Sequence, residues 1–438
     1  MKWLTKNILY VFIVLLPIID VSTSLIERFI EPAISPGMVV RGLLLIAGTL
    51  YLLIKKDSAW RRVNLIYICL MALYFIGFFL SRVNSFYIQD YYIEIKAFIK
   101  FAYYPLILLF LLNYSNSQNF DKTKLLKSLK LSIIIYSLGI IIPYFTGTAF
   151  NSYRDGNLGI SGWFYSANEM GIILALCLVL LFFEDTKKWY DYVVVLLLLF
   201  ALSLLGTKVV VFSTLLTTIL FFIINLFRMK FNFKKSSLLF SLVAVVFSLF
   251  MVFTSPTIAN VLGRLEGLPF LDRFFVKTIA PVEVQMSEYE KERWKNHQGN
   301  KIIDILLSSR QFYLEDTFKE YKNANLHSQI FGLGYVHQDH TLRKLVELDY
   351  FDLFFDYGVT GFIILACLPF IIFFKAFLKS LKKITYQTVL LFWGLFLAFG
   401  VACSAGHVIG APAVSGYLSI FITLYYVLSV TNKGEQVK

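Results

Sequence analysis

The chain has 438 residues, of which 58% are hydrophobic and 16% are charged, and its formal net charge is +13. A soluble domain carries about 25% charged residues, so this composition excludes a single aqueous globular core. Apolar runs of about 18 to 25 residues recur along the sequence, and a helix of that length crosses about 30 Å of hydrocarbon. Unbroken apolar runs such as 193–205 lack the alternation of a β-barrel. The sequence therefore predicts an all-α integral membrane protein.

We predict a bundle of about twelve transmembrane helices with one large extracytoplasmic loop. Residues 1–255 contain the first nine spans, residues 256–349 form the loop, and residues 350–438 contain the last three spans and a short tail. The apolar stretch after Ile8 is too long for a removed signal peptide, so we expect it to remain as the first helix. The predicted spans cover residues 8–30, 37–54, 63–80, 97–113, 125–146, 168–183, 189–206, 208–227, 236–255, 350–374, 385–404 and 411–430.

The distribution of basic residues predicts the orientation of the chain. With twelve spans, both termini lie on one side, which also holds the basic segments 55–62, 122–130 and 375–383. The positive-inside rule makes that side cytoplasmic. The long loop is balanced, with 12 basic and 13 acidic residues. Topology thus explains the net charge, and nucleic acid is not an expected partner.

The long loop is the segment with the composition of a soluble domain. Between residues 302 and 321 its apolar residues recur at helical spacing, which predicts amphipathic helices lying on the outer membrane face. We expect this segment to form a partly helical cap.

The sequence predicts neither a metal site nor a disulfide. Cys69, Cys177, Cys367 and Cys403 all lie in apolar runs or at their edges. The histidines lack a metal-ligand spacing such as His-Glu-x-x-His. We expect no cofactor.

Two groups of polar residues precede the long loop on the outer side. The first begins at Arg154 and continues through a glycine-rich stretch to Asn168, which indicates irregular backbone packed tightly against neighbouring helices. An ordinary turn with Asn168 as helix cap is the alternative. The second is the short turn that ends at Lys208, whose side chain could bind an anion or extend to the interface.

The largest group of acidic residues lies where the long loop enters the tenth span. Asp349, Asp352 and Asp356 are spaced by three and four residues, so one helical face would carry all three into the bundle. A solvated helix start favoured by the helix dipole is the alternative, and it accounts for Glu347 and Asp349 but less well for Asp356. A fourth group contains His407 in the last outer loop, where a structural role is the commoner one for a single histidine.

The order of these groups resembles the superfamily of bacterial O-antigen ligases and O-antigen polymerases over roughly residues 150–430. Its motifs include a Gly-aromatic-x-x-x-Asn element, matched by 162–168, and a short turn with a cation, matched near Lys208. A long outer loop follows with an arginine, matched by Arg310, and a Gly-x-Gly, matched by 332–334. The loop closes on an acidic-x-Gly element, matched by 356–361. Relatives carry a His-Asn pair where this chain has Glu347-Leu348.

The resemblance implies a metal-independent membrane glycosyltransferase of the GT-C kind that inverts the sugar centre. Its donor and acceptor would be undecaprenyl-diphosphate-linked glycans. Arginine binds phosphate bidentately, so Arg154 and Arg310, with Lys208 as a point charge, are candidates for binding the diphosphate. Glu347, Asp349 and His407, in that order, are candidates for the general base.

The resemblance leaves two activities open, and a third class competes with both. A polymerase of O-antigen, capsule or exopolysaccharide would join repeat units in the bacterial cytoplasmic (inner) membrane, with a chain-length regulator and a flippase as partner candidates. A ligase would move a finished glycan to another acceptor. A lipid-linked oligosaccharide flippase would place its charges near the midplane, whereas here they gather at the outer face.

The topology predicts that cysteines introduced at Ser236 and Ser287 react differently with an impermeant thiol reagent in intact cells. Ser287 lies in the outer loop and should be labelled, while Ser236 lies on the cytoplasmic side and should not. The parent chain serves as the control. Labelling at Ser236 but not at Ser287 would reverse the orientation.

Overall fold

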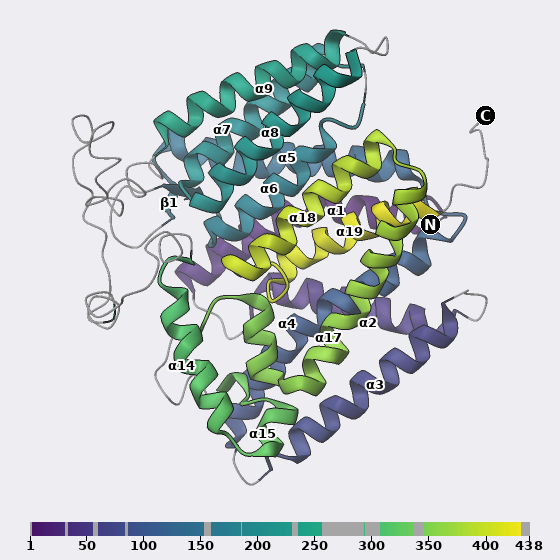
Figure 1. Cartoon of the computed structure of the whole chain (residues 1–438), viewed down its shortest axis with the longest axis vertical. Coiled ribbons are helices and arrows are strands. Elements are labelled where there is room, and N and C mark those ends of the chain that lie inside the picture. The colour runs from purple at the N-terminus through teal and green to yellow at the C-terminus, as the bar shows by residue number, and fades with distance from the viewer. Residues whose placement is uncertain are drawn as a thin grey trace. The chain divides into compact units, whose positions relative to one another are not determined.

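The computed structural model describes residues 2–30, 34–55, 60–83, 86–152, 159–184, 186–229, 235–255, 293, 307–336 and 345–430. Ten helices in these ranges are long and apolar enough to cross a membrane, and two further apolar helices, Ala167–Leu180 and Trp189–Leu205, are shorter. Each of the twelve predicted spans coincides with one of these helices. The all-α polytopic fold is therefore confirmed (Figure 1).

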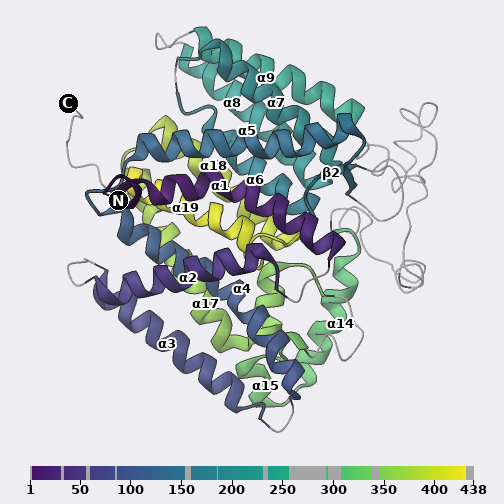
Figure 2. The same cartoon turned by 180° about the vertical axis from the view of Figure 1, so that it is seen from behind.

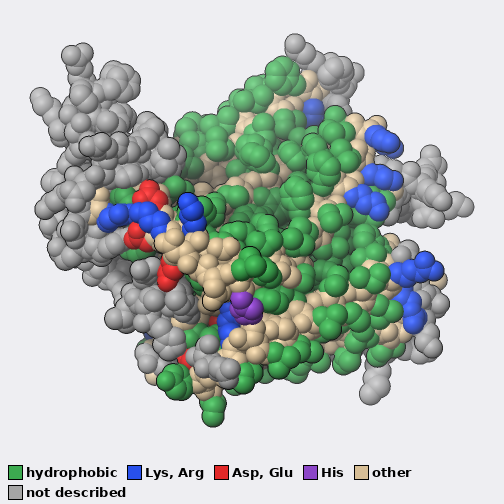
Figure 3. Space-filling model, turned by 60° about the horizontal axis from the view of Figure 1, so that its bottom comes forward, with side chains coloured by type: hydrophobic (Ala, Val, Ile, Leu, Met, Phe, Trp, Pro, Cys, Tyr) green, Lys and Arg blue, Asp and Glu red, His purple; other side chains and the backbone are tan. Residues whose placement is uncertain are grey.

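The chain divides into two compact units, Met1–Val39 with Asp121–Lys291, and Val40–Phe120 with Glu292–Lys438. These units join segments that are distant in sequence. The expected boundaries at residues 255 and 349 rest on hydropathy, and they stay predictions. Hydrophobic side chains cover most of the face seen in Figure 3, whereas charged side chains gather in a few patches. Such a surface suits a protein whose solvent is largely lipid.

The first unit is built on α5, which packs against α1, α6 and α7, while α8 and α9 pack on each other and on α7 (Figure 2). Buried polar contacts join α1 to α5. The Tyr136 hydroxyl donates to Asp20 at 2.6 Å, and the Ser132 hydroxyl donates to the Ile13 carbonyl at 2.6 Å. Its elements are α1 (Lys2–Phe29), α5 (Lys122–Thr146), β1 (Phe150–Asn151), β2 (Ile160–Gly162), α6 (Ala167–Leu180), α7 (Trp189–Leu205), α8 (Lys208–Met229) and α9 (Lys235–Thr254).

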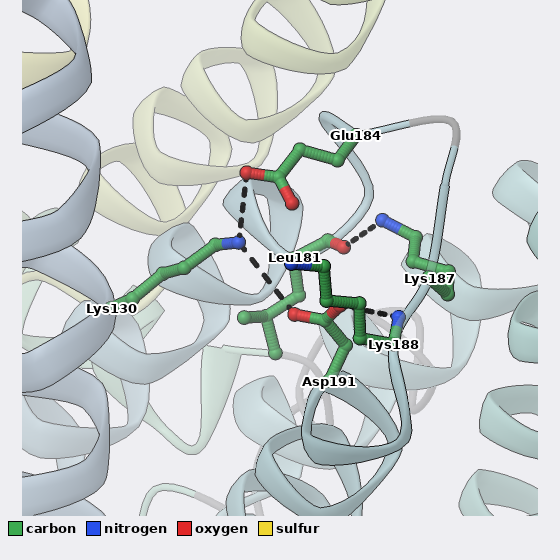
Figure 4. Close-up of polar contacts among 6 residues, drawn as sticks. All are labelled: Lys130, Leu181, Glu184, Lys187, Lys188 and Asp191. Carbon is green, nitrogen blue, oxygen red and sulfur yellow. Dashed lines mark hydrogen bonds and ion pairs between the residues drawn. The ribbon is translucent and has the colours of Figure 1, made fainter.

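A charged cluster joins α5 to the turn between α6 and α7 (Figure 4). Lys130 pairs with Glu184 at 3.1 Å and with the buried Asp191 at 3.7 Å. Asp191 also accepts the backbone N–H of Lys188 at 2.9 Å, so it caps α7. The Lys187 ammonium donates to the Leu181 carbonyl at 2.6 Å at the end of α6. These contacts satisfy helix ends on the side predicted to be cytoplasmic.

The second unit is organised around α17, which packs against α3, α4, α14, α15, α18 and α19. Its α4 begins at Ile88 rather than at residue 97, because the polar residues of its first turns are buried and bonded. Its α17 continues to Lys382 rather than ending at residue 374. The elements are α2 (Pro36–Ile54), α3 (Arg61–Leu80), α4 (Ile88–Ser115), α14 (Arg310–Asn323), α15 (Leu326–Phe331), α17 (Asp349–Lys382), α18 (Tyr386–Ser404) and α19 (Pro412–Val430).

Helix α17 is broken at Gly358, which has φ 65° and ψ −174°. Only glycine adopts this conformation readily. The break frees backbone carbonyls, and the segment after α15 uses them: the Leu333 N–H donates to the Phe355 carbonyl at 2.8 Å, and the Gly334 N–H donates to the Asp356 carbonyl at 3.0 Å. The part of α17 before the break, residues 349–357, is hereafter the N-terminal segment of α17.

We predict that Gly358→Ala destabilises the protein while Gly400→Ala does not. A Cβ atom at Gly358 would lie 2.4 Å from the Gly332 nitrogen and from the Ile330 oxygen, whereas a Cβ at Gly400 would meet nothing within 4 Å. The strained backbone alone costs about 1–3 kcal/mol. Thermal unfolding of the purified variants in detergent should show a midpoint lower by several degrees for Gly358→Ala only. Equal midpoints would contradict the tight contact at the break.

Candidate functional site

The acidic residues at the start of α17 are buried, as their spacing predicted. Asp349, Asp352 and Asp356 expose 5%, 7% and 0% of their surface. The helix begins at Asp349, and the Asp352 carboxylate accepts the N–H of Leu348 at 3.0 Å, closing the first turn. A solvated helix start therefore does not describe this segment. Carboxylates buried at the end of a span are costly unless their partners are built into the fold.

Asp349 holds the loop between α18 and α19. Its Oδ1 accepts the backbone N–H of His407 at 3.0 Å, and its Oδ2 accepts those of Val408 and Ile409, both at 2.7 Å. Three backbone donors on one carboxylate form a strong charge-assisted contact. Gly406 packs closely against the backbone just before Asp349, since a Cβ there would lie 2.5 Å from the Glu347 carbonyl oxygen. The loop that carries His407 is thus fixed against the start of α17.

Arg310 and Glu347 form an ion pair beside this contact. The Arg310 Nη2 lies 2.8 Å from the Glu347 Oε2, and the two side chains are 13% and 24% exposed. Arg310 begins α14, so its position follows from that helix. Its buried Nε has no hydrogen-bond partner among the residues that the structure describes. The structure therefore brings together four predicted site residues, namely Arg310, Glu347, Asp349 and His407.

Backbone strain concentrates around these four residues. Within the part of the chain that the structure describes, the non-glycine residues with positive φ are Ser308 (52°), Ser309 (70°), Glu347 (59°) and His407 (61°). Two of them precede Arg310 directly, and the other two are candidate bases. Non-glycine residues in such conformations cluster at functional sites, where the surrounding structure enforces the strain. The location of this strain points to the same site as the ion pair.

The remaining predicted site residues belong to the first unit. Lys208 is half-buried at the first position of α8. Arg154 lies outside the described residues. Their roles in binding a diphosphate stay predictions.

The glycine-rich stretch near residue 160 packs closely against its neighbours, as predicted. A Cβ at Gly162 would lie 2.4 Å from the Gly139 oxygen, and a Cβ at Gly159 would lie 2.5 Å from the Leu205 oxygen. Ser166, not Asn168, caps α6, since its hydroxyl accepts the Glu169 N–H at 3.3 Å. The alternative that made Asn168 the cap is wrong, because α6 starts at Ala167 and Asn168 already lies in its first turn.

Two buried charged residues of the second unit, Arg82 and Glu94, were missed by the sequence analysis. Arg82 is 7% exposed and Glu94 is fully buried. Both contact the segment that crosses the break in α17, and neither contact is local in sequence. A glutamate inside the apolar run that forms α4 was the signal that could have revealed this cluster.

We predict that Asp349→Asn loosens the His407 loop. The amide keeps one acceptor oxygen, so at least one of the three backbone N–H groups loses its bond, at a cost of about 1.5–3 kcal/mol. Amide hydrogen exchange of a peptide covering residues 405–411 should be at least about tenfold faster. Asp90→Asn is the matched control, because Asp90 is buried too and accepts the Tyr87 N–H at the start of α4. Unchanged exchange at 405–411 would show that Asp349 does not hold the loop.

Comparison with known proteins identifies the family. No curated protein sequence matches the chain. The family of O-antigen ligase like membrane proteins matches residues 2–432, nearly the whole sequence. This range includes every residue of the candidate site. The chain therefore belongs to the family of O-antigen ligase like membrane proteins, whose members are membrane enzymes of glycan transfer.

Proposed function

We propose that this protein polymerises undecaprenyl-diphosphate-linked oligosaccharide repeat units at the outer face of the bacterial cytoplasmic membrane, with both termini in the cytoplasm. The observation that carries the proposal is the Arg310–Glu347 ion pair, which places a cation for a phosphate beside a carboxylate for a hydroxyl proton. The strained residues on both sides of the pair support a site that is held for chemistry.

Glu347 is the proposed general base. It is the most exposed of the clustered carboxylates, and it forms an ion pair with Arg310. Asp349 is buried and already accepts three backbone N–H groups, so its contacts favour positioning the His407 loop over taking a proton. His407 is half-exposed and remains the competing base.

The reaction proceeds as a single displacement. The acceptor hydroxyl oxygen bonds to the anomeric carbon of the donor sugar while the bond from that carbon to the diphosphate oxygen breaks. Glu347 takes the hydroxyl proton, and the lipid diphosphate leaves with the bonding electron pair. Arg310 binds the charge that develops on the leaving group, where its Nε–H, which has no partner among the described residues, would gain an acceptor. The sugar centre inverts, and the chain's own residues suffice for these steps.

Purified protein supplied with a lipid-linked repeat unit tests the proposal directly. A polymerase gives a ladder of lengthened glycans on a gel. A single transfer to a second acceptor would instead identify a ligase. Passage of the lipid-linked glycan across vesicles without a new glycosidic bond would identify a flippase.

We predict that Glu347→Gln lowers turnover at least about a hundredfold, because it removes the base while keeping the size of the side chain. Glu315→Gln is the matched control: Glu315 pairs with Arg293 at 3.1 Å in the same unit, but that pair is more exposed. The Glu315→Gln variant should polymerise normally. Normal turnover of Glu347→Gln, together with an inactive His407→Ala, would transfer the role of base to the histidine.

A further inference from the structure

Arg82, just after α3, is buried against the segment that follows α15. Its Nη2 donates to the Gly332 carbonyl at 2.6 Å, and its Nη1 donates to the Phe78 carbonyl and the Ser81 hydroxyl, both at 3.2 Å. The guanidinium carbon lies 3.8 Å from the centre of the Phe78 ring. Burial lowers the pKa of Arg82, and the Glu94 carboxylate raises it. The geometry is that of a cation fixed by its partners.

Glu94 holds the next residues of the same segment from α4. Its Oε2 accepts the backbone N–H of Val336 at 3.1 Å, and its Oε1 has no hydrogen-bond partner among the described residues. Gly334 lies between the two charges, since a Cβ there would be 3.3 Å from the Glu94 Oε2 and 3.4 Å from the Arg82 Nε. Arg82 and Glu94 thus hold residues 332–336, and we call this pair and its contacts the clamp.

The clamped segment lies on the break in α17. A Cβ at Gly332 would lie 2.1 Å from the Asp356 oxygen, so the two backbones touch. From α3, the Tyr74 hydroxyl contacts the Tyr357 carbonyl at 2.7 Å and the Phe331 carbonyl at 3.2 Å. The clamp therefore fixes the C-terminal end of the N-terminal segment of α17. The other end of this segment begins at Asp349 and follows Glu347.

The clamped segment also follows directly after α15, and α15 is tied to α14, the helix that carries Arg310. Gln329 of α15 donates to the carbonyls of Lys322 and Ala324, both at 3.1 Å, which ties α15 to the end of α14. Tyr321 of α14 packs in a cluster with Val346, Leu348 and Phe355. Arg310 is thus connected to the clamped segment through α14 and α15. Glu347 is connected to it through the start of α17.

We propose that Arg82 and Glu94 are positioning residues, which set the geometry of the Arg310–Glu347 pair by clamping residues 332–336 onto the break in α17. Neither residue is assigned contact with substrate. The effect on turnover rests on the proposed function, whereas the effect on geometry does not. A misplacement of about 1 Å at a reacting centre can lower a rate about a hundredfold.

The test combines a distance with a rate. Spin labels on cysteines at the exposed positions Ile88 and Lys322, in a chain whose native cysteines are replaced, report how α14 is held relative to the start of α4. We expect a narrow distance distribution in the parent and a broad one in Arg82→Gln and Glu94→Gln. In chains with native cysteines, both substitutions should lower kcat about tenfold to a hundredfold. Arg82→Lys should restore kcat only in part, because the bidentate fork is lost.

The matched control is Asn64→Ala. Asn64, near the start of α3, and Asn113, near the end of α4, form a buried amide pair at 3.2 Å. The clamp residues lie at the other ends of these two helices. This variant should lower stability while keeping the narrow distribution and the parental kcat per folded molecule. Narrow distributions in Arg82→Gln and Glu94→Gln would overturn the clamp, whatever their rates. Broad distributions with parental kcat would show that the clamp does not position the site. A parent without polymerase activity but with the expected distances would reject the proposed function and leave the clamp standing.

Discussion

The break in α17 is the feature on which the second unit depends. A helix in lipid satisfies its own backbone groups, so an interruption frees carbonyls and N–H groups that need other partners. Here the segment 332–336 supplies the missing donors, with glycines at 332, 334 and 358 allowing the backbones to touch. Satisfying the break thus brings a distant part of the long loop onto α17. The Gly-x-Gly and acidic-x-Gly motifs therefore form the two sides of one packing contact.

Hydropathy was sufficient to predict the helices but not their ends. The twelve apolar runs are continuous, and a bilayer leaves them little choice but to form helices. The start of α4 was misplaced because Asp90 and Glu94 have the polarity of a loop. Their partners are the Tyr87 N–H and the distant Val336 N–H. A buried charge whose partner lies far along the chain cannot be distinguished from an exposed one by composition.

In the candidate site too, features set by neighbouring residues could be predicted from the sequence, whereas contacts between distant segments could not. The spacing of Asp349, Asp352 and Asp356 predicted their burial, because helical periodicity is local. That Asp349 binds the loop of residues 407–409, or that Arg310 pairs with Glu347, depends on tertiary packing between segments far apart in sequence. Motif order placed these residues in one site only through the resemblance to a family. Arg82 and Glu94 belong to no motif considered and were therefore missed.

The contacts of the candidate site distinguish residues that position the backbone from residues that are proposed to take part in the reaction. Asp349, Arg82 and Glu94 are buried and bonded to backbone groups, so a substrate would have to displace structural bonds to reach them. Arg310 and Glu347 are bonded to each other through side chains and are partly exposed, as the proposed reaction requires of residues that bind substrate. Ser308, Ser309, Glu347 and His407 keep strained backbones that the surrounding contacts must enforce. Because Asp349 and the clamp secure opposite ends of the N-terminal segment of α17, the rigidity needed to hold that strain comes from residues that need not take part in the proposed reaction.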